Sequence, residues 1–181
     1  LWDVQGWVGN DYHRLWLKSE GDRHETGIQA LYSRAVSPFF DLQLGFRHDF
    51  EPQPARSHVV IGVQGLAPHW FEIDAAAFIS DEGVVSAKLE AEYDMRLTQR
   101  LILQPRAESE VGFGDDEELG LGSGIREIDL SLRLRYEIRR KLAPYLGIGW
   151  RRAFGDTADF LELDGDDSSE FFTVAGLRFW F

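Results

Sequence analysis

Apolar and polar side chains alternate without interruption between Ile128 and Ile138. One parity carries Ile128, Leu130, Leu132, Leu134, Tyr136 and Ile138, and the other carries Asp129, Ser131, Arg133, Arg135 and Glu137. Successive side chains of a β-strand point to opposite faces of the sheet. The segment is therefore predicted to be a strand with one wholly apolar face and one heavily charged face. Either face could be the one that meets water.

The same period of two recurs along the whole chain and constrains its fold class. No segment approaches the ~20 apolar residues of a membrane-spanning helix, and the pattern predicts no helix elsewhere. We predict an all-β chain that forms a single domain over residues 1–181. Its strands, about ten in number, are expected at residues 11–20, 25–37, 39–50, 57–66, 70–80, 84–96, 100–113, 124–139, 143–154 and 170–181.

Short and long connections alternate between these segments. The short ones lie around residues 37–38, 67–68, 97–99 and 141–144, and three of them contain proline, as tight turns often do. The others, at 20–25, 50–57, 80–83, 114–122 and 155–169, are mostly longer, charged and contain glycine or proline. This asymmetry predicts an up-and-down antiparallel β-barrel with short periplasmic turns and longer extracellular loops, as in outer-membrane proteins.

Two orientations of such a barrel are possible. A soluble, lipocalin-like barrel would bury the leucines and expose the charges, whereas a transmembrane barrel would do the reverse. The transmembrane orientation is favoured by the density of carboxylates and arginines on one face, by aromatic residues near both strand ends, and by an alternating last segment that closes on Phe181. We therefore expect a barrel of the bacterial outer membrane. Pro105 lacks an amide donor, so a bulge or break in the ladder is expected there.

Charge and cysteine content exclude some functions. The formal net charge of −12 at pH 7 argues against a nucleic-acid partner, because phosphate binding requires patches of lysine and arginine. The sequence has no cysteine, so it can form neither disulfides nor a zinc-finger-type site.

Several long blocks of the sequence resemble one known family. They are "RLWLKSEG" (14–21), "ALYSRAVSPFFDLQLGFRHDF" (30–50), "GVQGLAPHWFEIDAAAFIS" (62–80), "EAEYDMRLTQRLILQPR" (90–106) and "LRLRYEIRRKLAPYLGIGW" (132–150). Over nearly the whole chain they resemble the copper-resistance protein B family of bacterial copper-resistance systems. The resemblance implies an outer-membrane barrel that handles copper ions. It further implies contact with outer-membrane lipid and lipopolysaccharide, and with periplasmic copper-handling proteins. The family also implies a Met- and His-rich segment before the barrel, which this sequence lacks, so we expect the barrel domain alone.

If the charged parity faces inward, carboxylates outnumber cations in the lumen. Rings of aspartate and glutamate favour cations in a pore. The alternative is that these groups pair with arginine and lysine across a filled lumen. The residues expected to meet a metal ion are His48, Asp49, His58, Glu72, Asp74, Glu90, Glu92, Asp94, Glu108 and Glu110.

Copper is expected as a transported or weakly bound ion and not as a catalytic cofactor. Thiolate and thioether ligands select Cu(I), but cysteine is absent and Met95 is the only methionine. Imidazole and carboxylate suit Cu(II). His48, Asp49 and His58 lie near the outer ends of two consecutive strands and are the first candidates.

Three functions remain open at this point. The first is a barrel that binds or conducts copper ions across the outer membrane. The second is an outer-membrane hydrolase with an Asp/His site at its rim, although no nucleophile motif accompanies the histidines. The third is a plugged barrel that anchors a copper-binding tail. We favour the first, and expect no enzyme.

Overall fold

The computed structural model describes residues 2–21, 26–51, 54–116, 120–139, 142–165 and 167–179. Within them, twelve antiparallel strands form one sheet. The strands are β1 (Trp2–Gly9), β2 (His13–Gly21), β3 (Thr26–Ala35), β4 (Phe40–Glu51), β5 (Arg56–Ala67), β6 (Phe71–Ser80), β7 (Val85–Tyr93), β8 (Met95–Arg96), β9 (Leu101–Gly112), β10 (Gly124–Tyr136), β11 (Leu142–Ala153) and β12 (Ser169–Phe179). Two helical segments accompany them, the 3₁₀ turn η1 (Pro68–Trp70) and the helix α1 (Gly155–Asp164).

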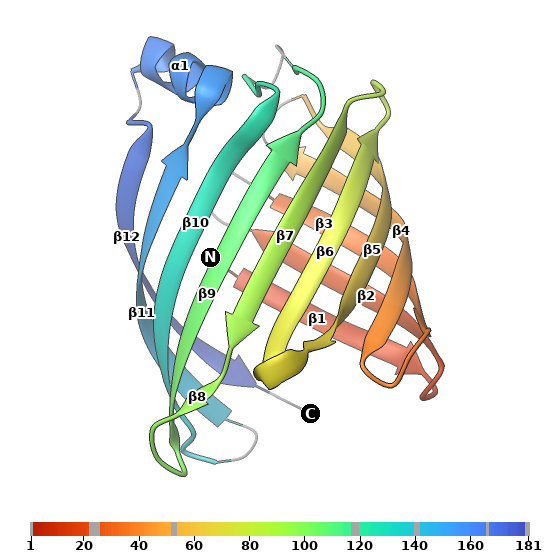
Figure 1. The fold of residues 1–181 in the computed structure, drawn as a ribbon, viewed down its shortest axis with the longest axis vertical. Coiled ribbons are helices and arrows are strands. Elements are labelled where there is room, and N and C mark those ends of the chain that lie inside the picture. Colours follow the sequence, from red (N-terminus) through yellow and green to blue (C-terminus); the bar gives the residue numbers. More distant parts are fainter. Residues whose placement is uncertain are drawn as a thin grey trace.

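The sheet is an up-and-down meander in which the strands pair in sequence order, with the short β8 pairing with β9 beyond the end of β7. It curls so that β1 to β3 lie behind the wall formed by β6, β7, β9 and β10 (Figure 1). The short turns gather at the lower end in that view, and α1 lies at the opposite, long-loop end. β1 and β12 are the two edges, and no backbone ladder joins them within residues 2–9 and 169–179. The predicted all-β, up-and-down architecture is confirmed.

The exposure of the side chains decides which face of the sheet lies outside. On β10, Leu132 and Leu134 are both 41% exposed, whereas Ser131 and Arg135 are 7% and 5% exposed. The apolar parity therefore lies on the outer face, and the charged parity lines the enclosed side. A soluble barrel requires the opposite arrangement, so that alternative is wrong. An apolar exterior around a polar interior is the arrangement of an outer-membrane barrel.

The expected number of strands was too low. β1 was not predicted because Trp7 falls on its polar parity and Gly6 on its apolar parity. In the structure, Trp7 packs against Trp16 of β2, with 6.3 Å between the ring centroids. The strand predicted at 84–96 is divided into β7 and β8. The predicted strand ends at residues 25 and 180–181 lie outside the described residues.

Pro105 interrupts the ladder on one side of β9. Pairing between β7 and β9 reaches Glu92 and Arg106, and β8 resumes it at Met95 and Leu103. Because proline has no N–H to donate, the positions between these pairs form no ladder. On its other side, Pro105 pairs with β10 in unbroken register. The predicted break is confirmed.

The helix α1 contradicts the expectation that the chain contains no helix. It occupies the last long connection and ends at Gly165, whose φ of 89° is a left-handed conformation that glycine adopts readily. The Gly165 N–H donates to the carbonyls of Leu161 and Glu162. The helix was not predicted because this segment has no apolar stripe at helical spacing and its N-cap, Phe154, provides no side-chain hydrogen bond. Among the described residues, no helix is long and apolar enough to cross a membrane.

The outer face of β10 provides a test of the membrane orientation. Leu132→Arg should destabilise the folded barrel by about 2–4 kcal/mol, because the guanidinium would leave water for hydrocarbon in the middle of the strand. Guanidinium chloride unfolding of the barrel in lipid vesicles measures this change. Ile138→Arg, just beyond the end of β10, is the control and should cost only about 0–1 kcal/mol. Equal losses for the two variants would contradict the assignment.

Candidate functional site

The structure places all the candidate residues except His48 on the inner face. The inner residues come from four regions: Asp49 of β4 and His58 of β5, Glu72 and Asp74 of β6, Glu90, Glu92 and Asp94 on or next to β7, and Glu108 and Glu110 of β9. His48 lies on the opposite parity, where its Nδ1 is 2.9 Å from the Ser57 hydroxyl and its ring meets Phe50 edge-on. His48 is therefore separated from the lumen by the sheet.

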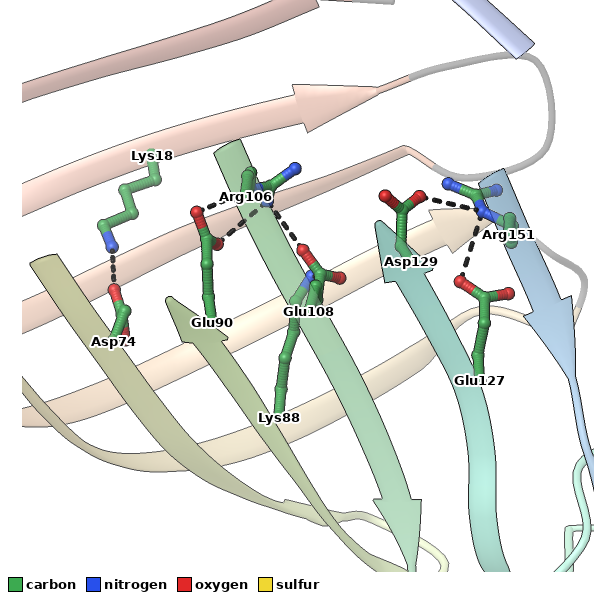
Figure 2. A network of polar contacts seen from close by, with 9 residues as sticks. All are labelled: Lys18, Asp74, Lys88, Glu90, Arg106, Glu108, Glu127, Asp129 and Arg151. Carbon is green, nitrogen blue, oxygen red and sulfur yellow. Dashed lines mark hydrogen bonds and ion pairs between the residues drawn. The ribbon is translucent and has the colours of Figure 1, made fainter. Parts of the chain in front are cut away.

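A cluster of four charged residues, Lys88, Glu90, Arg106 and Glu108, crosses the middle of the wall and is called here the Arg106 cluster (Figure 2). Arg106 donates from Nε and Nη2 to the two Glu90 oxygens at 2.6 and 2.8 Å, and from Nη2 to Glu108 at 2.6 Å. Lys88 Nζ lies 2.5 Å from Glu108. Two-pronged arginine–carboxylate contacts of this kind are strong and fix both partners. Glu90 and Glu108 are thus held in place and neutralised by cations.

An ion pair also connects strands that are not neighbours in the sheet. Lys18 of β2 lies 3.4 Å from Asp74 of β6, and both side chains are partly buried (Figure 2). Because β3, β4 and β5 separate these strands in the sheet, the contact is made across the interior. Asp74 is therefore paired as well.

Further ion pairs lie toward the long-loop end. Arg151 of β11 contacts Glu127 at 3.2 Å and Asp129 at 3.4 Å, both on β10 (Figure 2). Arg126 of β10 contacts Glu110 of β9 at 3.1 Å. Neighbouring strands thus contribute alternating charges, and these carboxylates are also paired.

Toward the short-turn end, not every carboxylate forms an ion pair. Arg135 donates to Asp94 at 2.6 Å, and the Gln104 amide donates to Asp94 at 2.8 Å and also to Glu92. Glu72 pairs with Glu92 in the β6–β7 ladder. Within the described part of the chain, neither Glu72 nor Glu92 has a cation at ion-pair distance. These two adjacent carboxylates lack a direct ion pair and are uncompensated in that sense, although Arg106 of the Arg106 cluster is the ladder partner of Glu92.

The histidine candidate in the lumen has one acidic neighbour. His58 Nδ1 lies 3.3 Å from Asp49, and Asp49 also accepts a hydrogen bond of 2.6 Å from Arg47. The ring of His58 meets Phe78 nearly edge-on, with 6.2 Å between the centroids. No three histidine, aspartate or glutamate side chains of the described residues are grouped so that they could hold one metal ion. His58 and Asp49 could therefore contact a passing ion but do not form a complete cage.

The sequence analysis did not predict a set of contacts across the long-loop end. They hold residues 114–116 and 120–122 of the β9–β10 connection, which are called here the strap. Arg56 of β5 reaches Asp116 in the β9–β10 connection at 3.4 Å, and both side chains are 8% exposed. It also contacts Glu82 of the β6–β7 connection at 3.6 Å. Arg126 holds the same β9–β10 connection by donating to the carbonyls of Gly114 and Gly122. Residues 117–119 lie outside the description, but the segments on either side are tied to the barrel mouth.

The lumen also contains an apolar cluster that the sequence analysis did not foresee. Leu31, Val60 and Phe78 are buried on the inner parity of β3, β5 and β6, and Trp16 and Ala76 pack against them. These residues occupy positions where the charged parity was expected to continue. In the sequence these residues are visible only as apolar positions on the polar parity. A single sequence does not show whether such positions form a cluster or are isolated exceptions. The part of the lumen beside β3 and β5 is consequently less charged than the part beside β7, β9 and β10.

Sequence comparison identifies relatives over the whole chain. A family described as "Copper resistance protein B precursor (CopB)" matches residues 1–181. The chain is 43% identical over 185 residues to the copper resistance protein B of Escherichia coli and to a copper resistance protein B homolog of Pseudomonas syringae pv. tomato. Each alignment covers 99% of this chain, but 62% and 63%, respectively, of the relatives. The chain therefore spans somewhat less than two thirds of their length.

A structural comparison supports the barrel architecture. The solved NanC porin structure matches with a TM-score of 0.65, covering 99% of this chain and 92% of that chain. Only 10% of the aligned residues are identical, so the likeness concerns the fold alone.

The strap generates a prediction about local stability. Asp116→Asn should increase amide exchange of the hydrogen-bonded pair Asp116–Leu121 by about tenfold, because the charged contact with buried Arg56 is lost. Hydrogen–deuterium exchange of the reconstituted barrel, followed by mass spectrometry, measures it. Asp159→Asn, on the exposed surface of α1, is the matched control. Unchanged exchange in Asp116→Asn would show that the ion pair does not hold the strap.

Proposed function

The chain belongs to the copper resistance protein B family, and we propose on this basis that it conducts copper ions across the outer membrane through its acidic lumen. The observation that carries the proposal is the pair of carboxylates Glu72 and Glu92, which face the lumen without forming a direct ion pair among the described residues. Carboxylates in a channel with low-dielectric walls concentrate cations.

The arrangement of the other carboxylates supports a pathway with weak binding. Three lumen carboxylates are compensated by cations: Glu90 and Glu108 in the Arg106 cluster, and Asp74 beside Lys18. They lower the electrostatic barrier to the passage of a cation without binding it tightly. Conduction requires binding that is strong enough to admit an ion and weak enough to release it. Met95, the only thioether, lies on the outer parity opposite Leu103 and so contributes no soft ligand to the lumen.

The position of the histidine pair is consistent with a first contact for Cu(II). His58 and Asp49 lie near the long-loop end of β5 and β4, above Glu90 and Glu92 on the proposed route. Imidazole and carboxylate oxygen suit Cu(II) better than Cu(I). The ion would then pass toward the short-turn end, where periplasmic copper-handling proteins are the proposed acceptors.

A second candidate function is a closed barrel that anchors a copper-binding segment. The Lys18–Asp74 pair favours it, because this pair places two side chains across the interior. A flux measurement separates the two candidates, since only an open pathway carries copper.

The hydrolase alternative has less support from the geometry. His48 lies on the outer parity while His58 and Asp49 face the lumen, so the three residues it would need do not share one face. A general base must lie within hydrogen-bonding reach of its proton, and His48 cannot assist the other two.

The proposal is tested by neutralising the two uncompensated carboxylates. Glu72→Gln combined with Glu92→Gln should reduce copper influx into proteoliposomes about fivefold or more, because the local attraction for cations is removed. Influx is followed with an internal fluorophore that copper quenches. The triple variant with Glu90, Glu92 and Glu108 changed to glutamine should also conduct less copper.

The matched control carries the same change in net charge outside the lumen. Asp11→Asn with Asp159→Asn neutralises two exposed carboxylates, one in the β1–β2 turn and one on α1, and should leave influx within about twofold of the unmodified barrel. Equal influx through the lumen variant and the unmodified barrel would overturn the acidic pathway. Absence of influx through the unmodified barrel would favour the closed barrel.

A further inference from the structure

Arg133 of β10 is a lumen arginine without a carboxylate partner. Within the described residues it forms no ion pair, and its Nε is buried without a hydrogen-bond partner. Its guanidinium carbon lies 5.9 Å from the ring centre of Tyr145, which supports it from one side. Its ladder partner is Gly147, where an added Cβ would approach the Arg133 Cγ to 3.0 Å. The glycine thus leaves the space that the arginine side chain occupies.

The uncompensated acidic pair lies in the same region of the lumen. The ladder partner of Arg133 on β9 is Gln104, and the Gln104 amide donates to Glu92. Glu92 has Glu72 beside it on β6. The positive charge of Arg133 on β10 therefore lies near the negative charge of Glu92 on β7 without forming a direct ion pair with it.

A polar group with no partner lies next to Arg133. Ser131 is two residues earlier on the same inner parity and is 7% exposed, and its Oγ has no hydrogen-bond partner among the described residues. Its ladder partner on β11, Gly149, has no side chain to contact it and is covered by the Phe172 ring, and its partner on β9 is Arg106. A buried hydroxyl normally has a partner, so Ser131 points to a ligand that is hydrogen-bonded there when it is bound.

We propose that Arg133 and Ser131 bind the carboxylate of a small ligand whose positively charged group faces Glu72 and Glu92. The chemistry fits an α-amino acid, either free or as its 1:1 chelate with copper(II). The chelate form rests on the proposed copper conduction, whereas binding of the free amino acid does not.

The two ends of such a ligand match the two sets of charges, Arg133 on β10 and the carboxylates on β6 and β7. A guanidinium donates two parallel hydrogen bonds to a carboxylate, which a lysine or an amide cannot reproduce. The ammonium group of the free amino acid, or the copper ion of the chelate, carries the positive charge that Glu72 and Glu92 attract. A 1:1 copper glycinate has a charge of about +1, compared with +2 for the bare copper(II) ion. Its electrostatic repulsion by the arginines of the lumen is therefore smaller.

The experiment compares two copper complexes in proteoliposomes. Copper(II) is supplied with glycine at 1:1, or with ethylenediamine, which chelates through nitrogen but has no carboxylate. Arg133→Gln should lower influx of the glycine complex about fivefold and leave that of the ethylenediamine complex unchanged or higher. Arg133→Lys should restore part of the glycine-complex influx, because the charge returns without the planar donor pair. Arg100→Gln, in the exposed turn before β9, is the matched control and should behave like the unmodified barrel.

Radiolabelled glycine without copper distinguishes the two ligands and separates the two proposals. Slower glycine uptake through Arg133→Gln would support the site for the free amino acid, even if the unmodified barrel conducts no copper in any form. An effect on the glycine complex alone would support the site for the chelate. Equal effects of Arg133→Gln on both copper complexes, or no effect on either copper complex or on glycine, would overturn the inference. The ethylenediamine complex would still test the acidic pathway through Glu72 and Glu92.

Discussion

The absence of water from the hydrocarbon core of a bilayer is the constraint on which this structure depends. Backbone N–H and C=O groups there must pair within the protein, so the chain is a sheet, and the side chains that meet lipid must be apolar. With a period of two, every other residue is forced inward. The inward positions of β7, β9 and β10 are mostly charged or amide side chains, whereas Ala76 and Phe78 of β6 belong to the apolar cluster. The apolar exterior and the ionisable interior therefore have a single cause.

These charges are crowded into a narrow interior. The electrostatic potential of the lumen therefore depends mainly on which of them form ion pairs. Most carboxylates have an arginine or lysine beside them, as in the Arg106 cluster and at Lys18–Asp74 (Figure 2). Taking ions out of water is costly unless they are compensated, which explains why isolated charges are few. Glu72, Glu92 and Arg133 are exceptions, and they lie together toward the short-turn end. The functional proposals rest on these uncompensated groups and not on the total acidity of the chain.

Sequence reasoning succeeded where the pattern is local. The alternation from Ile128 to Ile138 is sufficient to assign the strand and its two faces, and the missing N–H of Pro105 is sufficient to locate the break in the ladder. The partners of the inward charges depend on the curvature of the sheet, so contacts such as Lys18–Asp74 and Arg56–Asp116 could not be read from residue spacing. β1 and α1 escaped prediction because Trp7 breaks the period in one and no helical stripe marks the other.

The most direct measurement is a cysteine scan of residues 130–135, which is feasible because the sequence contains no cysteine. Single cysteines carrying a spin label are examined in vesicles, with oxygen as the lipid-soluble quencher and a nickel chelate as the water-soluble one. Labels at positions 130, 132 and 134 should respond to oxygen, and labels at 131, 133 and 135 to the nickel chelate or to neither. Water accessibility at the even positions, with the odd positions in contact with lipid, would contradict the assignment of the two faces and the lumen pathway built on it.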